Sequence, residues 1–285
     1  MDQSKILIIG ANGQLGLALK AQYPEAQTVD IDELDITDKK SVDSYDWSKV
    51  DIVLNAAAYT NVDGAETPEG RVAAWKVNAT AVKNLTYAFW QNNLSVIVHI
   101  SSDYVFDGTQ KEHLENELFS PLSVYGASKA AGDLLVSQVD KHYILRTSWV
   151  IGEGKNFVRT MLGLGQNGVA PAVVDDQIGR LTFTSEIVRA IDHLLKTKAE
   201  FGTYNITNSG ESVSWADVTR QIFSEAGFEL QVAGTTTEEY FKDKTGIAPR
   251  PLNSSLALSK IQSTGFESRD WKDDLKDYIK KELAK

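Results

Sequence analysis

Tyr125 and Lys129 are the first residues in this sequence whose types and spacing suggest chemistry. They lie four residues apart in the stretch SVYGASKAAGDLL, which begins at Ser123 and has the pattern of a helix start. That spacing places both side chains on one helical face. The ordinary pKa of a phenol is about 10, and a neighbouring ammonium group favours the phenolate and lowers that pKa. We therefore expect Lys129 to adjust Tyr125 for proton exchange with a carbonyl oxygen.

A hydroxyl group that could assist this pair comes from Ser102. Ser102 is the last residue of the apolar stretch LSVIVHISS, residues 94–102, which predicts a buried strand. The carboxyl ends of such strands line the ligand crevice of a parallel sheet. The hydroxyl of Ser102 can donate a hydrogen bond to the same carbonyl oxygen and stabilise its developing negative charge. The Tyr-Lys spacing also arises by chance in many helices, so the hypothesis depends on a cofactor site elsewhere in the chain.

Such a site is indicated near the N-terminus by Gly10, Gly13 and Gly16 in the stretch ILIIGANGQLG. Gly10 permits a tight turn, Gly13 lets the backbone approach a pyrophosphate, and Gly16 allows close packing of helix on strand. The free N–H groups at the helix start then face the phosphates. The alternative, a glycine-rich turn with no ligand, is less favoured because an acidic residue follows at the expected distance.

That acidic residue is Asp30, at the end of the second predicted strand, where a dinucleotide presents its ribose hydroxyls. No Arg or Lys lies between Asp30 and Asp38, where a 2′-phosphate would bind. Charge alone favours NADH over NADPH. Backbone and hydroxyl groups can also hold that phosphate, so both cofactors stay open.

Strands and helices alternate in the first half of the chain, and the strands are nearly all apolar. Such strands are buried on both faces, as in a parallel sheet. We predict an α/β fold: a Rossmann-type doubly wound parallel sheet with a smaller C-terminal α/β substrate lobe. The expected strands cover residues 5–10, 27–31, 50–59, 94–102 and 142–152, and the expected helices 14–23, 71–93 and 121–139.

The alternation weakens after Ser148, which suggests a discontinuous division of the chain. We assign residues 1–148, with about 178–200, to the NAD(P)-binding Rossmann domain. Residues 149–177 and 201–285 are assigned to the smaller substrate-binding lobe.

The composition excludes several classes of function. Lys and Arg total 29 against 39 for Asp and Glu, a net charge of −10 that repels a phosphate backbone, so we expect no nucleic-acid partner. There is no cysteine, and the four histidines show no metal-ligand spacing, so we expect no metal. No apolar run is long enough to span a membrane and no signal peptide precedes the first strand. We expect a cytoplasmic protein.

Longer motifs make the chain resemble the dTDP-4-dehydrorhamnose reductase family of the extended short-chain dehydrogenase/reductase superfamily. The glycine loop and the Tyr-Lys spacing mark only the superfamily. The more specific segments are NAAAYTNVDGAE, SSDYVFDG, RTSWV, KNFV and RPLNSSL.

This resemblance implies reduction of dTDP-4-dehydro-L-rhamnose to dTDP-L-rhamnose by NADPH or NADH, in the biosynthesis of dTDP-rhamnose and cell-surface polysaccharide. It implies that Tyr125 is the proton donor, that Lys129 holds the cofactor, and that Ser102 fills a position usually occupied by threonine. The implied cofactor contacts are Gly13, Gln14, Leu15, Asp30, Asp35, Ile36, Ala57, Ala58 and Tyr59. The implied substrate contacts are Asp103 and Trp149, with Arg250 and Asn253 of RPLNSSL as further contributors.

Two other departures from the family pattern affect the expected site and assembly. Leu181 stands where proline is common, which would reshape the substrate loop. Some members carry a glutamate two residues past the third glycine and dimerise through bound magnesium. Here that position is Ala18, so we expect a monomer or weak homodimer without that metal.

Two alternatives remain open. An epimerase or dehydratase of the same superfamily would share the cofactor site, but dehydratases usually have an acidic pair after the active-site hydroxyl, and here only Asp103 follows Ser102. Some similar proteins bind NADP as regulatory subunits and often lose the catalytic set, which is intact here.

Overall fold

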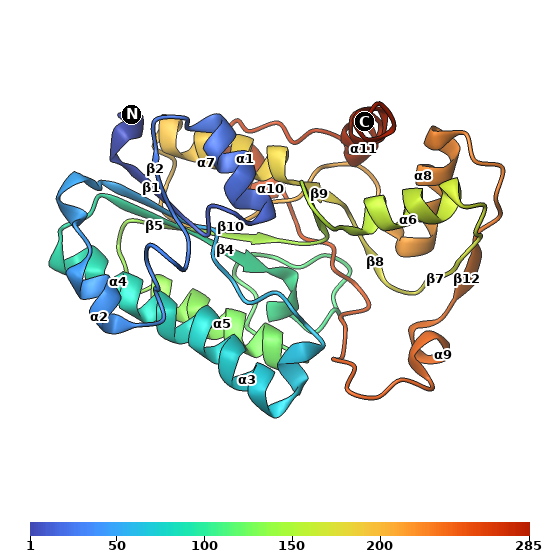
Figure 1. Cartoon of the computed structure of the whole chain (residues 1–285), viewed down its shortest axis with the longest axis horizontal. Coiled ribbons are helices and arrows are strands. Elements are labelled where there is room, and N and C mark those ends of the chain that lie inside the picture. The colour runs from blue at the N-terminus through green and yellow to red at the C-terminus, as the bar shows by residue number, and fades with distance from the viewer.

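The computed structural model describes residues 1–285 and contains a central sheet of six strands that are all parallel (Figure 1). The predicted doubly wound α/β fold is confirmed. The strand order is β10-β5-β4-β3-β1-β2, so the direction of winding reverses between β1 and β3. The strands are β1 (Ile6–Ile9), β2 (Gln27–Val29), β3 (Ile52–Asn55), β4 (Val96–Ser102), β5 (His142–Thr147) and β10 (Gly202–Asn205).

The apolar character of the strands follows from burial on both sheet faces. In β1, Ile6 and Ile8 pack into one core cluster and Leu7 and Ile9 into the other. Successive side chains of a strand point to opposite faces, so a run of four apolar residues is what a sheet covered on both sides requires.

Helices cover both faces of the sheet (Figure 1). The first core cluster contains residues of α1, α7 and α10, and the second contains residues of α2, α4 and α5. These helices are α1 (Gln14–Gln22), α7 (Thr184–Thr197), α10 (Ser259–Ser263), α2 (Lys39–Ser44), α4 (Ala81–Gln91) and α5 (Val124–Val136).

The helix predicted over residues 71–93 is interrupted. It consists of α3 (Pro68–Trp75), a π-helical turn over Lys76–Thr80 and then α4. Sequence periodicity does not reveal a single wide turn, because the residues on either side keep helical spacing. π-helical turns often occur at functional sites, and Asn78 at the centre of this turn hydrogen-bonds to the backbone of Tyr59, in the segment after β3.

A third core cluster, separate from the two sheet faces, lies in the second body at the right of Figure 1. Its helices are α6 (Phe157–Gln166), α8 (Trp215–Ala226) and α11 (Trp271–Leu283), with the short α9 (Thr237–Phe241) nearby. Three two-stranded pairings complete it: β6 (Val150–Ile151) with β9 (Thr182–Phe183), β7 (Ala172–Val174) with β12 (Ala233–Thr235), and β8 (Ile178–Gly179) with β11 (Val213–Ser214).

One part of the predicted division is wrong. Residues 202–205, assigned above to the smaller lobe, form β10 and pair with β5 at the edge of the central sheet. Tyr204 and Ile206 are buried in the first core cluster, together with Ile261 of α10. A four-residue strand carries no sequence signal for the sheet it joins, so only the tertiary contacts decide this.

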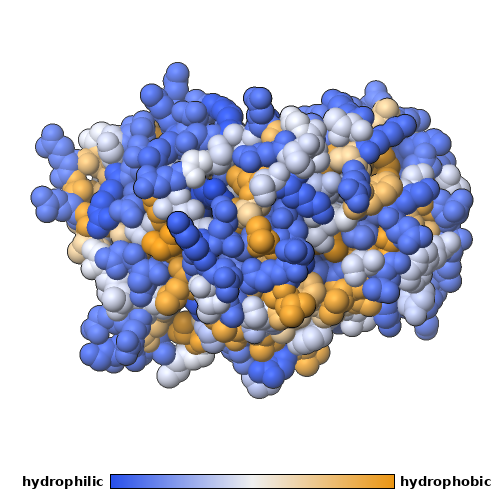
Figure 2. All heavy atoms as spheres, turned by 180° about the vertical axis from the view of Figure 1, so that it is seen from behind, coloured by the Kyte–Doolittle hydropathy of each residue, from blue (hydrophilic) through white to orange (hydrophobic).

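The outer surface is mainly hydrophilic on the face seen in Figure 2, with apolar atoms gathered in its lower part. The layer of α3, α4 and α5 lies along that lower side in Figure 1. Its exposed large apolar side chains are Val72, Trp75, Tyr87, Trp90 and Leu134. No helix has both the length and the apolar character that crossing a membrane demands.

Candidate active site

The glycine loop between β1 and α1 is built for close backbone contacts. Gly10 has a φ of +76°, which L side chains rarely adopt. A Cβ at Gly16 would lie 2.2 Å from the carbonyl oxygen of Gly10, so α1 approaches the loop more closely than any side chain allows. Gly13 caps α1 without a side-chain hydrogen bond, which leaves the first N–H groups of the helix free for an anion.

A cavity of about 340 Å³ opens beside this loop, at the switch between β1 and β3. Asp30 lies on its wall directly after β2, and its carboxylate accepts hydrogen bonds from the backbone N–H groups of Asn12 and Ile31, each at 2.9 Å. These bonds fix the carboxylate where a ribose would lie. The predicted cofactor residues on this wall are Gly10, Gly13, Asp30, Asp35, Ile36, Ala57, Ala58 and Tyr59.

A second cavity of about 500 Å³ adjoins the first and shares Gly13, Ala56 and Ala58 with it. The shared lining means that one extended molecule can occupy both. The predicted residues on its wall are Gly13, Gln14, Leu15, Ala58, Ser102, Asp103, Tyr125, Lys129 and Trp149.

The buried polar atoms on this second wall that lack hydrogen-bond partners include Gln14 Oε1 and Thr147 Oγ1. Buried polar groups are normally paired, so these atoms indicate a site made for a polar ligand. Together with the open helix start at Gly13, they fit a dinucleotide beside a hydroxyl-rich substrate.

The pKa of Tyr125 differs from the expectation. Burial raises it to about 12; the Ser102 hydroxyl opposes this shift, and Asp103 and Asp133 reinforce it. Lys129 is not among the groups that change it, so the expected lowering by Lys129 is wrong for the protein alone. The physical reason is that desolvation disfavours the phenolate and that Lys129 Nζ instead donates to the backbone oxygen of Ile100 at 2.5 Å. At neutral pH Tyr125 is therefore a protonated donor.

Ser102 and Asp103 form a hydrogen-bonded pair at the carboxyl end of β4. Ser102 Oγ donates to Asp103 Oδ1 at 2.9 Å and accepts from the backbone N–H of Tyr104 at 3.2 Å. Burial raises the pKa of Asp103 to about 6, against the opposing effect of the Ser254 and Ser102 hydroxyls. A carboxyl group at this position can accept a hydrogen bond from a substrate hydroxyl at neutral pH.

Trp149 follows β5 in an unusual backbone conformation, with a φ of +48°. Its ring stacks on Trp215 of α8, with ring centres 3.7 Å apart. The main sheet thus presents this side chain to the second body at the cavity wall. A positive φ in a bulky residue is a strained conformation that often occurs at functional sites.

The structure does not bring Arg250 and Asn253 to the cavity wall. Arg250 forms a two-pronged ion pair with Asp63, at 2.5 and 2.8 Å. The amide of Asn253 donates to the backbone oxygens of Gln110 and Lys111. Both side chains are occupied by intramolecular partners, which the motif RPLNSSL gives no means to foresee.

A buried polar network, which the sequence did not predict, connects the segment after β3 with β4, α5 and the π-helical turn. The side chain of Asn78, in the π-helical turn, accepts a hydrogen bond from the backbone N–H of Tyr59. Its amide donates to the carbonyl oxygen of Tyr59 and to Ser128 Oγ. Asn55, at the end of β3, pairs with the buried ring of His99 at 3.1 Å. The residues of this network lie far apart in the chain, so residue spacing does not predict their hydrogen bonds. The only local signal is the wide turn at Asn78, and hydrophobic periodicity does not reveal that turn.

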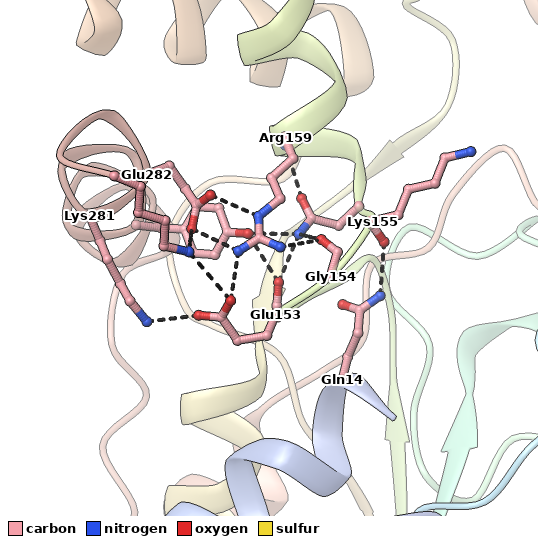
Figure 3. Close-up of polar contacts among 11 residues, drawn as sticks. Gln14, Glu153, Gly154, Lys155, Arg159, Lys281 and Glu282 are labelled. Carbon is pink, nitrogen blue, oxygen red and sulfur yellow. Dashed lines mark hydrogen bonds and ion pairs between the residues drawn. The ribbon is translucent and has the colours of Figure 1, made fainter. Parts of the chain in front are cut away.

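Gln14, at the start of α1, also connects the cofactor loop to the second body (Figure 3). Its Nε2 donates to the carbonyl oxygen of Lys155 at 3.1 Å. The loop that contains Lys155, between β6 and α6, also contains Glu153, which forms an ion pair with Arg159 of α6. Arg159 also pairs with Glu282 of α11. The loop between β6 and α6 therefore contacts the cofactor loop and both helices.

Comparison with known proteins identifies the family that has this arrangement. The family model described as "RmlD substrate binding domain" matches residues 4–284. The chain belongs to this family. It is 40% identical to a dTDP-4-dehydrorhamnose reductase of Aggregatibacter actinomycetemcomitans, over 96% of this chain and 97% of that protein.

Solved structures of this family agree with the fold. A dTDP-4-dehydrorhamnose reductase of Clostridium acetobutylicum matches with a TM-score of 0.89 and 37% identity, over 96% of this chain and 98% of that one. The Bacillus anthracis enzyme, whose structure is a complex with NADP, matches with a TM-score of 0.88 and 34% identity, over 97% and 98% of the two chains. The resemblance derived from the motifs is thereby confirmed.

Proposed function

We propose that this protein reduces dTDP-4-dehydro-L-rhamnose to dTDP-L-rhamnose, with NADPH or NADH as the hydride donor. The observation that supports this most strongly is the cavity wall on which Ser102, Tyr125 and Lys129 meet, open to the cavity beside the glycine loop. The activity named for relatives that match almost the whole length of the chain supports the same conclusion.

The reduced nicotinamide, when bound, supplies a hydride to the C4 carbonyl carbon of the sugar. The protein contributes the proton: the phenol of Tyr125, protonated because burial raises its pKa to about 12, donates to the sugar oxygen. Ser102, whose single hydroxyl proton goes to Asp103 Oδ1 in the structure, would turn it to that oxygen and stabilise its negative charge. Lys129 would hold the nicotinamide ribose.

For the cofactor, we propose that Gly13 and the start of α1 bind the pyrophosphate and that Asp30 accepts hydrogen bonds from the adenosine ribose. The carboxylates of Asp30, Asp32 and Glu33 follow one another closely after β2, which favours NADH over the additional phosphate of NADPH. The solved relative with NADP keeps both cofactors as candidates.

For the substrate, we propose that residues 149–177, together with β8 and β9, and most of the region after β10 form the lobe that binds the nucleotide sugar. Asp103 would accept from a sugar hydroxyl and Trp149 would stack against a ring at the junction of the two bodies. We also propose that the protein is a monomer or weak homodimer, which light scattering at several protein concentrations would test.

The decisive assay follows the loss of absorbance of the reduced nicotinamide after addition of dTDP-4-dehydrorhamnose, in parallel with NADH and NADPH. We expect net oxidation of at least one cofactor and formation of dTDP-L-rhamnose. A panel should include dTDP-4-keto-6-deoxy-D-glucose, because a relative with 35% identity over 78% of this chain is named as its reductase. No oxidation with any ketosugar would refute the proposal, and tightly retained NAD⁺ without net turnover would favour an epimerase.

A further inference from the structure

Asp133 and Arg146 form a buried ion pair close to Lys129, and neither residue has a role in the proposed reaction. Asp133 follows Lys129 by one turn of α5, and Arg146 reaches it from β5, with Nε and Oδ2 3.1 Å apart. The two side chains are only 1% and 4% exposed. A buried ion pair contributes little net stability, so stability alone gives no reason for two charges at this depth.

Arg146 is held rigidly on its far side. Its Nη1 donates to the carbonyl oxygen of Glu115 at 2.9 Å, and its guanidinium lies over the rings of Phe106 and Phe119, at 5.1 and 5.0 Å. The orientation of the Asp133 carboxylate is therefore fixed. Its second oxygen, Oδ1, is buried and faces the Ser101 hydroxyl, and no cation other than Arg146 pairs with the carboxylate.

The environment of Lys129 explains what that charge does. Asp133 faces it from α5 and His99 from β4. Tyr125 and Asp103 line the same cavity wall, and Arg146 pairs with Asp133. Burial lowers the pKa of Lys129 to about 8, and Asp133 is the group that opposes this shift. Burial lowers the pKa of His99 well below its usual value, so that ring is neutral.

We infer that Asp133, oriented by Arg146, is a positioning residue that keeps the buried Lys129 charged. This inference rests on the proposed function, because it assigns a task to Lys129 in the reduction. Lys129 Nζ has only the carbonyl oxygen of Ile100 as a hydrogen-bond partner. Asp133 supplies the negative charge that a buried ammonium group requires.

The test is the pH profile of the Asp133→Asn variant. We expect the alkaline midpoint of kcat/KM to move down by about 1 pH unit or more, because the amide no longer favours the charged lysine. The dissociation constant of NADH, measured by protein fluorescence, should rise above that midpoint and match wild type at lower pH. Asp133→Glu keeps the carboxylate and should restore the wild-type profile.

A purely structural role is tested by two further variants. Asp133→Asn leaves Arg146 unpaired and can fail to fold, so Asp133→Asn with Arg146→Met removes both charges, and it should show the same downward shift. Asp274→Asn removes a carboxylate that pairs with Arg269 in the second body and should leave the midpoint unchanged.

The outcomes separate this inference from the proposed function. A folded Asp133→Asn or double variant with the wild-type midpoint and the wild-type NADH profile overturns the role of Asp133. A wild-type protein that reduces no ketosugar refutes the proposed function. In that case the pH dependence of NADH binding by wild type and the Asp133 variants still decides whether Asp133 controls Lys129.

Discussion

Single residues in this site act through burial as much as through their neighbours. Desolvation raises the pKa of Tyr125 and lowers that of Lys129, so in the protein alone the phenol is protonated and the ammonium is close to losing its proton. The hydroxyl of Ser102 is fixed by Asp103 and the backbone. The site is thus prepared to donate a proton, and two measurements at the residue scale follow.

Replacing Tyr125 by Phe removes the proton donor while keeping the ring. We expect kcat to fall by roughly 10²–10⁴-fold, with the NADH dissociation constant close to that of wild type. Tyr104→Phe is the matched control, because its ring packs edge-on against Tyr125 at 5.4 Å; its loss of activity should be much smaller. A Tyr125→Phe variant that keeps most of its rate contradicts the mechanism.

The pH dependence of the reaction follows from Lys129. Its pKa is lowered to about 8, so the side chain is charged below that pH and loses its charge as the pH rises through it. We expect kcat/KM to fall on the alkaline side with a midpoint near that value. Lys129→Arg keeps a permanent charge, so whatever activity it retains should lack this decline. A wild-type midpoint near the ordinary lysine pKa of about 10.4 would count against the buried environment.

At the scale of elements, the site depends on how closely α1 approaches the end of β1. Two glycines of this motif, Gly13 at the cap of α1 and Gly16 within α1, have different tasks. Gly16 is needed for packing, since an added Cβ would overlap the backbone of Gly10 and Ala11. Gly13 has room for a Cβ, whose nearest neighbour would be 3.4 Å away, so we propose that the absence of a side chain there lets a pyrophosphate approach.

Alanine variants separate the two tasks. Gly16→Ala should lower the free energy of unfolding by roughly 1–3 kcal/mol through overpacking. Gly13→Ala should melt near the wild-type temperature yet bind NADH at least about tenfold more weakly, about 1.4 kcal/mol. Gly163→Ala, in α6 with open space around it, is the control for both. Thermal melting and NADH titration measure the two effects, and equal losses of binding and stability in Gly13→Ala would contradict the assignment.

At the scale of the whole molecule, ion pairs and hydrogen bonds join the sheet domain to the chain after it. Gln14 contacts the loop before α6, and Asp63, in the segment after β3, pairs with Arg250, which is 187 positions further along the chain. These contacts join the loop before α6 and the segment around Arg250 to the sheet domain.

The pair of Asp63 and Arg250 makes part of the stability depend on pH. Arg250 and the N–H of Ala248 lower the pKa of Asp63 against the effect of burial. A depressed carboxyl pKa contributes stability above its unfolded value of about 3.9 and loses it as the pH falls through the folded pKa. Asp63→Asn should therefore unfold more easily at neutral pH, by about 1 kcal/mol. This difference should shrink below about pH 4, and a pH-independent difference in melting temperature would argue for a packing effect.

The sequence by itself determined the class of fold, the strands and helices of the first half, the glycine loop and the trio of Ser102, Tyr125 and Lys129 as candidates. Those features depend on local rules: apolar runs that are buried on both faces, glycines required by close backbone contacts, and residues one helical turn apart. The motifs also sufficed to identify the family.

Only the tertiary structure decided the rest. In the structure β10 belongs to the central sheet and a π-helical turn surrounds Asn78. Arg250 pairs with Asp63, and Arg146 pairs with Asp133, one helical turn after Lys129. The structure also reversed the expected direction of the Tyr125 pKa shift. Each of these depends on partners distant in the chain and on how deeply a group is buried, and neither quantity is contained in the spacing of residues.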